Sequence, residues 1–138
     1  MGDWVIAVDT NVLVRFAVED DRQQADAARQ LFSEGDVFVP KTVLLETEWV
    51  LRAIYRKRRS EIAGYFRKLL DLRGATCEDE TQVKSAVEWF SSGMDFADAL
   101  HLAASTEASV FVTFDESLRK AASKVGARPP AKIPRRKP

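Results

Sequence analysis

The chain opens with an apolar run, residues 4–8, that stops abruptly at Asp9. Five consecutive apolar residues without polar alternation are typical of a strand that is buried on both faces, as in the parallel sheets of α/β proteins. Asp9 is then expected at the carboxyl end of a central strand, where open α/β sheets bind their ligands. Asp9 is therefore the first candidate for chemistry, and other acids at comparable positions would strengthen it.

The rest of the chain alternates predicted strands with predicted helices. Further strands are expected at residues 37–39, 75–77 and 110–114. Helices are expected at residues 11–18, from Asp20 or Asp21 to a stop at Gly35, at 43–55, from Ser60 to a stop at Gly74, around 83–90, at 96–107 and from the end of the last strand to about 124. This alternation predicts the α/β class, with a parallel sheet and right-handed crossovers.

Length and composition indicate one ordinary domain. The 138 residues, 46% of them apolar, are enough to bury a core. No apolar run is long enough to span a bilayer, and no charged-then-apolar leader opens the sequence. The single cysteine, Cys77, excludes an internal disulfide framework and fits a reducing compartment. We therefore expect a soluble cytoplasmic protein without membrane contact.

The formal net charge of zero conceals an uneven distribution. Residues 117–138 contain eight Lys or Arg and no acid, so residues 1–116 hold thirteen bases against all twenty-one acids. An acidic body and a basic end suggest metal binding in one part and phosphate contact in the other. Residues 128–138, with four prolines and five bases, are expected to form a flexible or extended tail, which leaves RNA contact, partner binding and a solvated end all open.

Glu46 is placed unusually for an acid. On a helix it shares a stripe with Val43 and Val50, whereas Glu48 falls off that stripe and is expected in solvent. A carboxylate on an apolar face is unfavourable by several kcal/mol unless it is paired, so a structural ion pair and a functional role both stay open.

Three further acids follow in the second half of the chain. Asp98 lies on the helix face that carries Met94 and Leu102, and Asp95 either shares its site or caps that helix. Asp115 repeats the position of Asp9, since it ends an apolar run and precedes a helix, and a capping role is open for it too.

Together these acids predict a metal site. Two strand ends and two helix faces would gather four carboxylates at one pole of a sheet, and such a cluster repels itself unless a cation is present. Oxygen ligands without His or Cys point to Mg²⁺ or Mn²⁺, which commonly act on phosphate groups. Thr10 and Thr113 stand beside the strand ends, where each either orients a carboxylate or water or serves as an ordinary strand or turn residue.

Four motifs resemble the PIN domain family and, more narrowly, the VapC toxins of bacterial type II toxin–antitoxin pairs. They are, in chain order, VDTNVL at residues 8–13, LETEWVL at 45–51, DFADAL at 95–100 and TFD at 113–115. The resemblance covers about residues 4–124. It implies a three-layer α/β/α domain, assigned to residues 1–127, with a small, mostly parallel twisted sheet of four to five strands.

The resemblance also implies a metal-dependent endoribonuclease that uses Mg²⁺ or Mn²⁺. The four family acids match Asp9, Glu46, Asp98 and Asp115. Metal ligation is attributed chiefly to Asp9 and Asp98, while Glu46 and Asp115 complete the ligand set through water or take part in proton transfer. Hydrolysis by activated water would leave a 5′-phosphate and a 3′-hydroxyl.

Supporting residues and partners follow from the same resemblance. Asn11 matches an amide that steadies the loop around the first acid, and Asp95 is an additional acid of its motif. A cognate VapB-like antitoxin and a homodimer are implied. Large apolar residues on two helices either fill the core or form a groove for the partner's helix: Trp49, Leu51, Ile54, Tyr55, Phe66, Leu69 and Leu70.

Two other classes of protein stay open. An aspartyl-phosphate receiver or a phosphatase of the haloacid dehalogenase type fits poorly, because the latter needs a second acid where this chain has Asn11. A catalytically silent PIN relative that binds RNA or protein is the other alternative, although the presence of all four acids argues against it.

Overall fold

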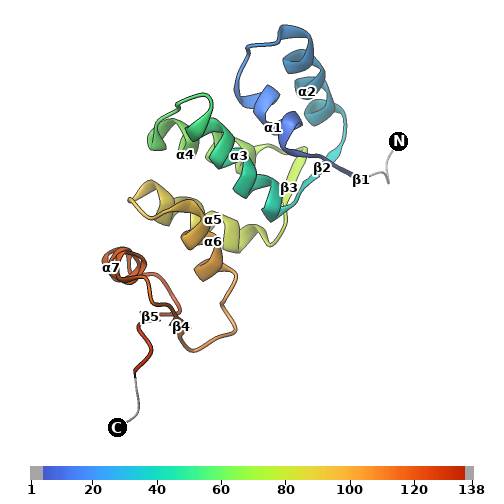
Figure 1. Cartoon of the computed structure of the whole chain (residues 1–138). Helices are drawn as coiled ribbons and strands as arrows, with labels where there is room; N and C mark the ends of the chain where they lie inside the picture. The colour runs from blue at the N-terminus through green and yellow to red at the C-terminus, as the bar shows by residue number, and fades with distance from the viewer. Residues whose placement is uncertain (1–4, 136–138) are drawn as a thin grey trace. The chain divides into compact units, whose positions relative to one another are not determined.

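The computed structural model describes residues 5–135 and is mixed α/β, as the sequence predicts (Figure 1). It forms two compact units, the N-terminal unit Met1–Glu80 and the C-terminal unit Thr81–Pro138. All five strands in the described part pair in parallel, but they belong to a three-stranded and a two-stranded sheet rather than to one sheet. Within residues 5–135, no helix combines the length and apolar character needed to cross a membrane.

The N-terminal unit alternates strands and helices over its whole length. Its elements are β1 Val5–Ala7, α1 Thr10–Ala17, α2 Arg22–Glu34, β2 Asp36–Val39, α3 Lys41–Ala53, α4 Arg59–Asp71 and β3 Ala75–Cys77. The predicted boundaries agree with these within a few residues, because capping residues mark the helix starts: the side chain of Asp21, for example, accepts a hydrogen bond from the backbone N–H of Gln24 at 3.1 Å.

The three-stranded sheet has the order β1-β2-β3, with Val37 opposite Ala75 and Val39 opposite Cys77. These four side chains are buried, whereas Thr76, on the alternate face, is exposed. The alternation is the period of two that a strand imposes on a half-buried sheet. One face of this sheet therefore forms the core of the N-terminal unit.

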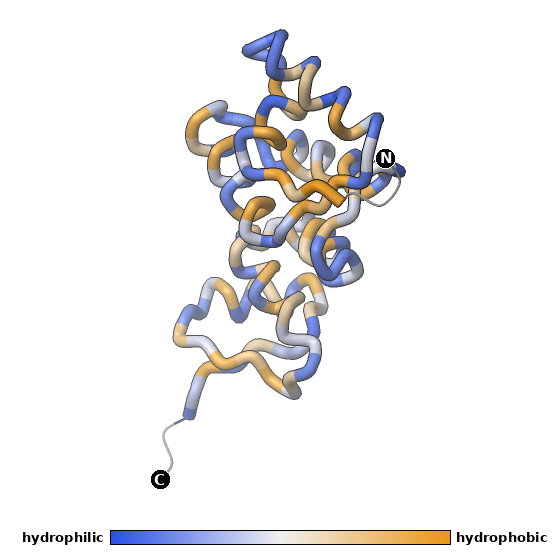
Figure 2. Tube along the Cα trace, turned by 90° about the vertical axis from the view of Figure 1, so that its right-hand side faces the viewer, coloured by the Kyte–Doolittle hydropathy of each residue, from blue (hydrophilic) through white to orange (hydrophobic). Residues whose placement is uncertain are grey.

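The prediction that the first strand is buried on both faces is wrong. Val5 is 66% exposed and Ile6 is 37% exposed, and only Val8, just past the strand, is buried at 7%. Neither face of β1 is covered, since all three of its side chains are exposed, and the strand lies at an edge of the three-stranded sheet, where it pairs with β2 alone. Figure 2 shows the apolar character of this edge near the N-terminal end of the trace. Trp4, the first residue of the predicted strand, lies outside the described residues.

The seven large apolar residues expected to fill the core or to form a partner groove differ in their exposure. Leu51, Phe66 and Leu69 are buried, and Tyr55 and Leu70 are half-buried. Trp49 and Ile54 are 52% and 61% exposed, so α3 keeps large apolar side chains in solvent toward its C-terminal end.

The C-terminal unit contains α5 Glu80–Ser91, which begins at the unit boundary, α6 Phe96–Ala103, β4 Phe111–Val112, α7 Glu116–Val125 and β5 Ala131–Lys132. Phe90 on α5 and Phe96 on α6 meet edge to face, with ring centroids 5.3 Å apart. These two rings contribute to the core of this unit, where both side chains are at most 3% exposed.

The strand predicted at residues 110–114 is shorter and more exposed than expected. Only Phe111–Val112 form β4, and Val110, Val112 and Phe114 are 38%, 56% and 86% exposed. β4 pairs with β5 alone, in a sheet of two strands.

Part of the basic end of the chain forms a short strand. Residues 131–132, inside the segment expected to be a flexible or extended tail, form β5 and pair in register with β4, so that Phe111 lies opposite Ala131. The sequence did not predict this strand because prolines lie on both sides of residues 131–132, and proline disfavours a strand except at an edge. The last three residues of the tail lie outside the described part.

Candidate functional site

Asp9 lies just after β1, as predicted, and is the N-cap of α1. Its backbone is extended, with φ −98° and ψ −178°, and its carboxylate oxygen Oδ1 accepts a hydrogen bond from the backbone N–H of Val12 at 3.4 Å. The side chain is exposed, and its second oxygen accepts no hydrogen bond from residues 5–135. Asp9 therefore combines a local capping role with an oxygen available to a ligand, next to the positive end of a helix dipole.

Thr10 connects the start of α1 to Glu46 on α3. The hydroxyl of Thr10, a residue only 7% exposed, donates a hydrogen bond to Oε1 of Glu46, 36 positions away in the chain. This contact places the side chain of Glu46 beside the residue that follows Asp9 in the N-terminal unit. Thr10 thus orients a carboxylate, one of the two roles the sequence left open.

The buried face of α3 is shifted by one residue from the face predicted to carry Glu46, so that prediction is wrong. The buried stripe of α3 carries Leu44, Thr47, Glu48 and Leu51, so Glu46 is exposed and Glu48 is only 3% exposed. Glu48 is neutralised by Arg52, whose Nε lies 2.7 Å from Oε2. Leu44, Thr47 and Leu51 have the spacing of a helix face and are the signal in the sequence that identifies the correct stripe.

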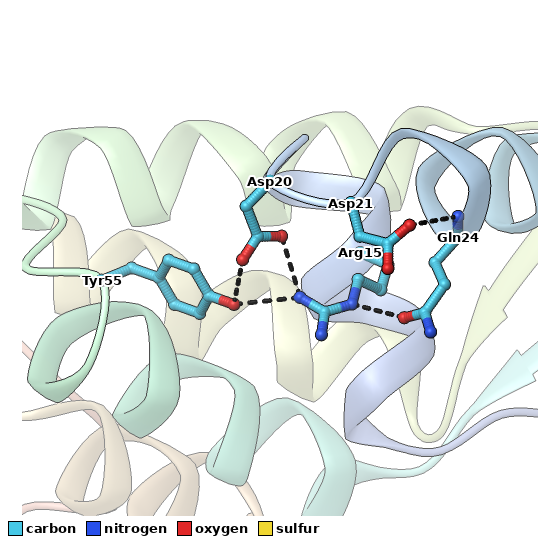
Figure 3. A network of polar contacts seen from close by, with 5 residues as sticks. All are labelled: Arg15, Asp20, Asp21, Gln24 and Tyr55. Atoms are coloured by element: carbon cyan, nitrogen blue, oxygen red, sulfur yellow. Dashed lines mark hydrogen bonds and ion pairs between the residues drawn. The ribbon is translucent and has the colours of Figure 1, made fainter.

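A polar network holds α1 against the end of α3 (Figure 3). The Arg15 guanidinium donates to Asp20 Oδ1 at 2.8 Å and to the Tyr55 hydroxyl at 3.0 Å, and that hydroxyl donates to Asp20 Oδ2 at 2.8 Å. The hydrogen bond from Tyr55 is the main cause of the lowered pKa of Asp20, and Arg15 adds to it. Arg15 also donates to Gln24 on α2 at 2.6 Å. The network therefore stabilises the placement of α1, which carries Thr10, relative to α3, which carries Glu46.

Asn11 follows Thr10 on α1. Its side chain is exposed on the first turn of α1, and no hydrogen bond joins it to Asp9 within the described residues. Together with Arg15, Gln24 and residues of both helices, it lines a hollow of about 250 Å³ between α1 and α2.

Asp98 lies in the first turn of α6 and is half-buried. Its pKa is raised, first by burial and then by the negative charges of Asp95 and Asp115, while His101 opposes the shift. Asp95 caps the helix, as predicted, by accepting a hydrogen bond from the backbone N–H of Asp98 at 3.1 Å. Asp98 is therefore a carboxyl whose ionised form is disfavoured until a cation compensates it.

Asp115 is the N-cap of α7 and accepts a hydrogen bond from the backbone N–H of Leu118 at 3.1 Å. The backbone N–H of Asp115 in turn donates to the Thr113 hydroxyl at 3.0 Å. Thr113 thus contacts the backbone of Asp115 rather than its carboxylate, which is the turn role that the sequence left open.

The sequence pattern of the PIN domain family matches residues 6–124 of this chain, across both units and all four candidate acids. The chain belongs to the PIN domain family. PIN domains are generally metal-dependent nucleases. The match favours this family over the aspartyl-phosphate proteins that the sequence left as an alternative. No curated protein matches the chain.

The donors of this PIN domain have the chemistry that a hard divalent cation requires. Asp9 and Glu46 in the N-terminal unit, and Asp98 and Asp115 in the C-terminal unit, offer carboxylate oxygens only. Burial raises the pKa of Asp98 most, the charges of Asp95 and Asp115 raise it further, and a bound cation would oppose both effects. Within residues 5–135, no group of three or more His, Cys, Asp or Glu side chains is arranged to hold a metal ion.

The raised pKa of Asp98 predicts a pH-dependent effect on stability. A carboxyl whose pKa is higher in the folded than in the unfolded state stabilises the fold below its ordinary pKa of 3.8, and this contribution is lost as the pH rises through the folded value. Asp98→Asn is therefore expected to raise the Tm of the metal-free protein at pH 7. The difference from the unmodified protein should shrink toward zero as the pH falls below about 4.

Thermal unfolding in EDTA from pH 3 to pH 8 measures this difference. Glu107→Gln removes an exposed charge from the same unit without touching the acid cluster, and it should leave the Tm unchanged. A lower Tm for Asp98→Asn at pH 7 would contradict the electrostatic interpretation.

Proposed function

We propose that this PIN domain is a metal-dependent endoribonuclease and the toxin of a VapBC-type toxin–antitoxin pair. The observation that carries the proposal is the hydrogen bond to Glu46 from Thr10, the residue that follows Asp9, inside a chain that matches the PIN pattern. The second pair, Asp98 and Asp115, interacts electrostatically within the other unit.

In this proposal Asp9 and Asp98 hold Mg²⁺ or Mn²⁺ directly, and Glu46 and Asp115 complete the ligand set through water or move protons. The ion, when bound, supplies polarisation of the phosphoryl group and a lowered pKa for water. The Thr10 hydroxyl engages one oxygen of Glu46 and so orients the other oxygen, which can accept a proton from the attacking water. In-line attack by water leaves a 5′-phosphate and a 3′-hydroxyl, and it needs neither His101 nor the RNA 2′-hydroxyl.

The proposed partners are a VapB-like antitoxin and a second copy of the chain, in the cytoplasm. Support for a docked partner comes from Trp49 and Ile54, which are large, apolar and exposed toward the end of α3. The hollow between α1 and α2 is a second surface in the same unit that an apolar helix could cover.

Incubation of the purified protein with RNA tests the proposed activity. Cleavage is expected with Mg²⁺ or Mn²⁺ and should stop when EDTA removes the metal. Sequencing of the products should identify 5′-phosphate ends. Metal-independent cleavage that leaves 5′-hydroxyl ends would refute the mechanism, and binding of RNA without any cleavage would favour the catalytically silent alternative.

A further inference from the structure

Helix α1 is connected to α3 and the turn that follows it by hydrogen bonds at two separate points. At the start of α1, the Thr10 hydroxyl donates to Glu46 on α3. Near the other end of α1, the Arg15 guanidinium donates at 3.0 Å to the hydroxyl of Tyr55, which lies two residues past the end of α3. Residues 10 and 15 are about 7.5 Å apart along a helix, because each residue adds about 1.5 Å. The two contacts are therefore well separated along α1.

Two separated contacts determine the orientation of a helix as well as its position. The hydrogen bond from Thr10 alone would fix one point and leave α1 free to pivot about it. The buried side chains of α1, Leu13 and Val14, add apolar contact, but the hydrophobic effect is not directional. The direction in which α1 presents the Thr10 hydroxyl to Glu46 therefore depends on the second contact, at Tyr55.

The backbone around Tyr55 is itself held in place. The backbone N–H of Tyr55 donates to the Val50 carbonyl at 3.2 Å, and that of Lys57 donates to the Leu51 carbonyl at 2.9 Å. Both acceptors belong to the last turns of α3. The Tyr55 ring, which is half-buried, thus extends from a segment that is tied to α3 rather than from a free loop.

The hydroxyl of Tyr55 uses both of its hydrogen-bonding functions in this contact (Figure 3). It accepts from Arg15 and donates to Asp20 Oδ2 at 2.8 Å, while Arg15 also donates to Asp20 Oδ1 at 2.8 Å. Hydrogen bonds to charged partners are stronger than those between neutral groups. Phenylalanine at position 55 would keep the ring and remove both bonds, so this one oxygen atom can be tested by itself.

We propose that Tyr55 is a positioning residue of this nuclease: it holds the orientation of α1 on α3 and thereby the hydrogen bond from Thr10 to Glu46. The inference rests on the proposed nuclease function, in which Glu46 completes the metal ligand set or moves a proton. It adds a residue that contacts neither the RNA nor the metal. A displacement of about 1 Å in a reacting group can lower a rate about 100-fold, so the orientation of α1 affects the reaction.

Cleavage kinetics of Tyr55→Phe in the full chain test the inference. We expect kcat to fall about tenfold while KM stays unchanged, because the lost hydroxyl affects the placement of Glu46 and not the binding of RNA. Tyr65→Phe is the matched control. Tyr65 lies on α4, is also half-buried, and its hydroxyl makes no hydrogen bond within residues 5–135, so this variant should keep both constants.

A double-mutant cycle shows whether Tyr55 acts through Thr10. Thr10→Val removes the hydroxyl at the first contact and keeps a β-branched side chain at this buried position. If both residues serve the placement of Glu46, the combined variant Thr10→Val/Tyr55→Phe should lose less in kcat than the product of the two single losses. Losses that simply multiply would overturn the inference, since the two contacts would then act independently.

Hydrogen exchange of the backbone amides of α1 measures the second contact without any cleavage. Exchange across Thr10–Ala17 should be faster in Tyr55→Phe and unchanged in Tyr65→Phe. If the unmodified protein cleaves RNA and Tyr55→Phe has the kcat of Tyr65→Phe, the inference is wrong and the nuclease proposal stands. If the unmodified protein cleaves no RNA, the nuclease proposal fails. In that case faster exchange in Tyr55→Phe would still support the role of Tyr55 in placing α1, and unchanged exchange would refute it.

Discussion

Replacing Asp9 by asparagine is expected to lower the rate of metal-dependent RNA cleavage at least about 100-fold. Loss of a residue that only supports a metal ligand typically costs 10- to 100-fold, so loss of a direct ligand should cost at least as much. The substitution keeps the fold, because asparagine caps helices about as well as aspartate and can still accept the hydrogen bond from Val12. Cleavage rates in Mg²⁺ and Mn²⁺, together with the Tm, measure both parts of the prediction.

Asp21 provides a matched control for Asp9. It is the N-cap of α2 in the same unit and accepts a hydrogen bond from Gln24, so Asp21→Asn changes the same type of residue in the same local geometry. Asp21→Asn should retain cleavage close to that of the unmodified protein. Equal losses in the two variants would mean that helix capping, and not metal binding, explains the effect of Asp9.

The largest expected effect on stability comes from Gly74→Ala. A Cβ atom at this position would lie 2.2 Å from the Phe32 carbonyl oxygen and 2.9 Å from the Gly35 carbonyl oxygen. Both contacts are with backbone, so relief requires the end of α2 to move relative to β3, and the Gly74 carbonyl also accepts a hydrogen bond from Val37 on β2 at 2.8 Å. We expect a loss of about 3 kcal/mol in the free energy of unfolding, at the upper end for overpacking.

Gly64→Ala is the opposite case and serves as the control. Gly64 lies inside α4, and a Cβ added there meets nothing within 4 Å. Alanine should stabilise the helix by about 0.5–1 kcal/mol, because glycine loses more backbone freedom on folding. Urea unfolding followed by circular dichroism measures both variants. If the two urea midpoints shift in the same direction, the close approach at Gly74 does not explain the effect of Gly74→Ala on stability.

Much of the local structure could be predicted from the sequence. Helix starts at Asp9, Asp21 and Asp95 follow from a short polar side chain that bonds to a backbone N–H three residues ahead. The contact between Asp95 and Asp98 was likewise within reach, since the two residues are three positions apart. These features depend only on neighbours along the chain.

The sequence predicted the residue types of the candidate site and their places at strand ends, but not the contacts between them. The prediction that Asp9 and Asp115 each follow a strand is confirmed. The hydrogen bond from Thr10 to Glu46 was not predictable, because it depends on how α1 and α3 pack rather than on the spacing of residues within either helix.

The sequence by itself determined the helices, the strands before residue 128, their parallel pairing and the residue types that can bind a cation, because capping, periodicity and side-chain chemistry are local properties. Only the tertiary structure decided which face of α3 is buried, so that Glu48 and not Glu46 enters the core. Only the tertiary structure made β1 and β4 exposed edges and made a strand of residues 131–132. Burial of a face and pairing of an edge both depend on segments that are distant in the chain. An apolar run does not show which of its faces or edges such a segment will cover.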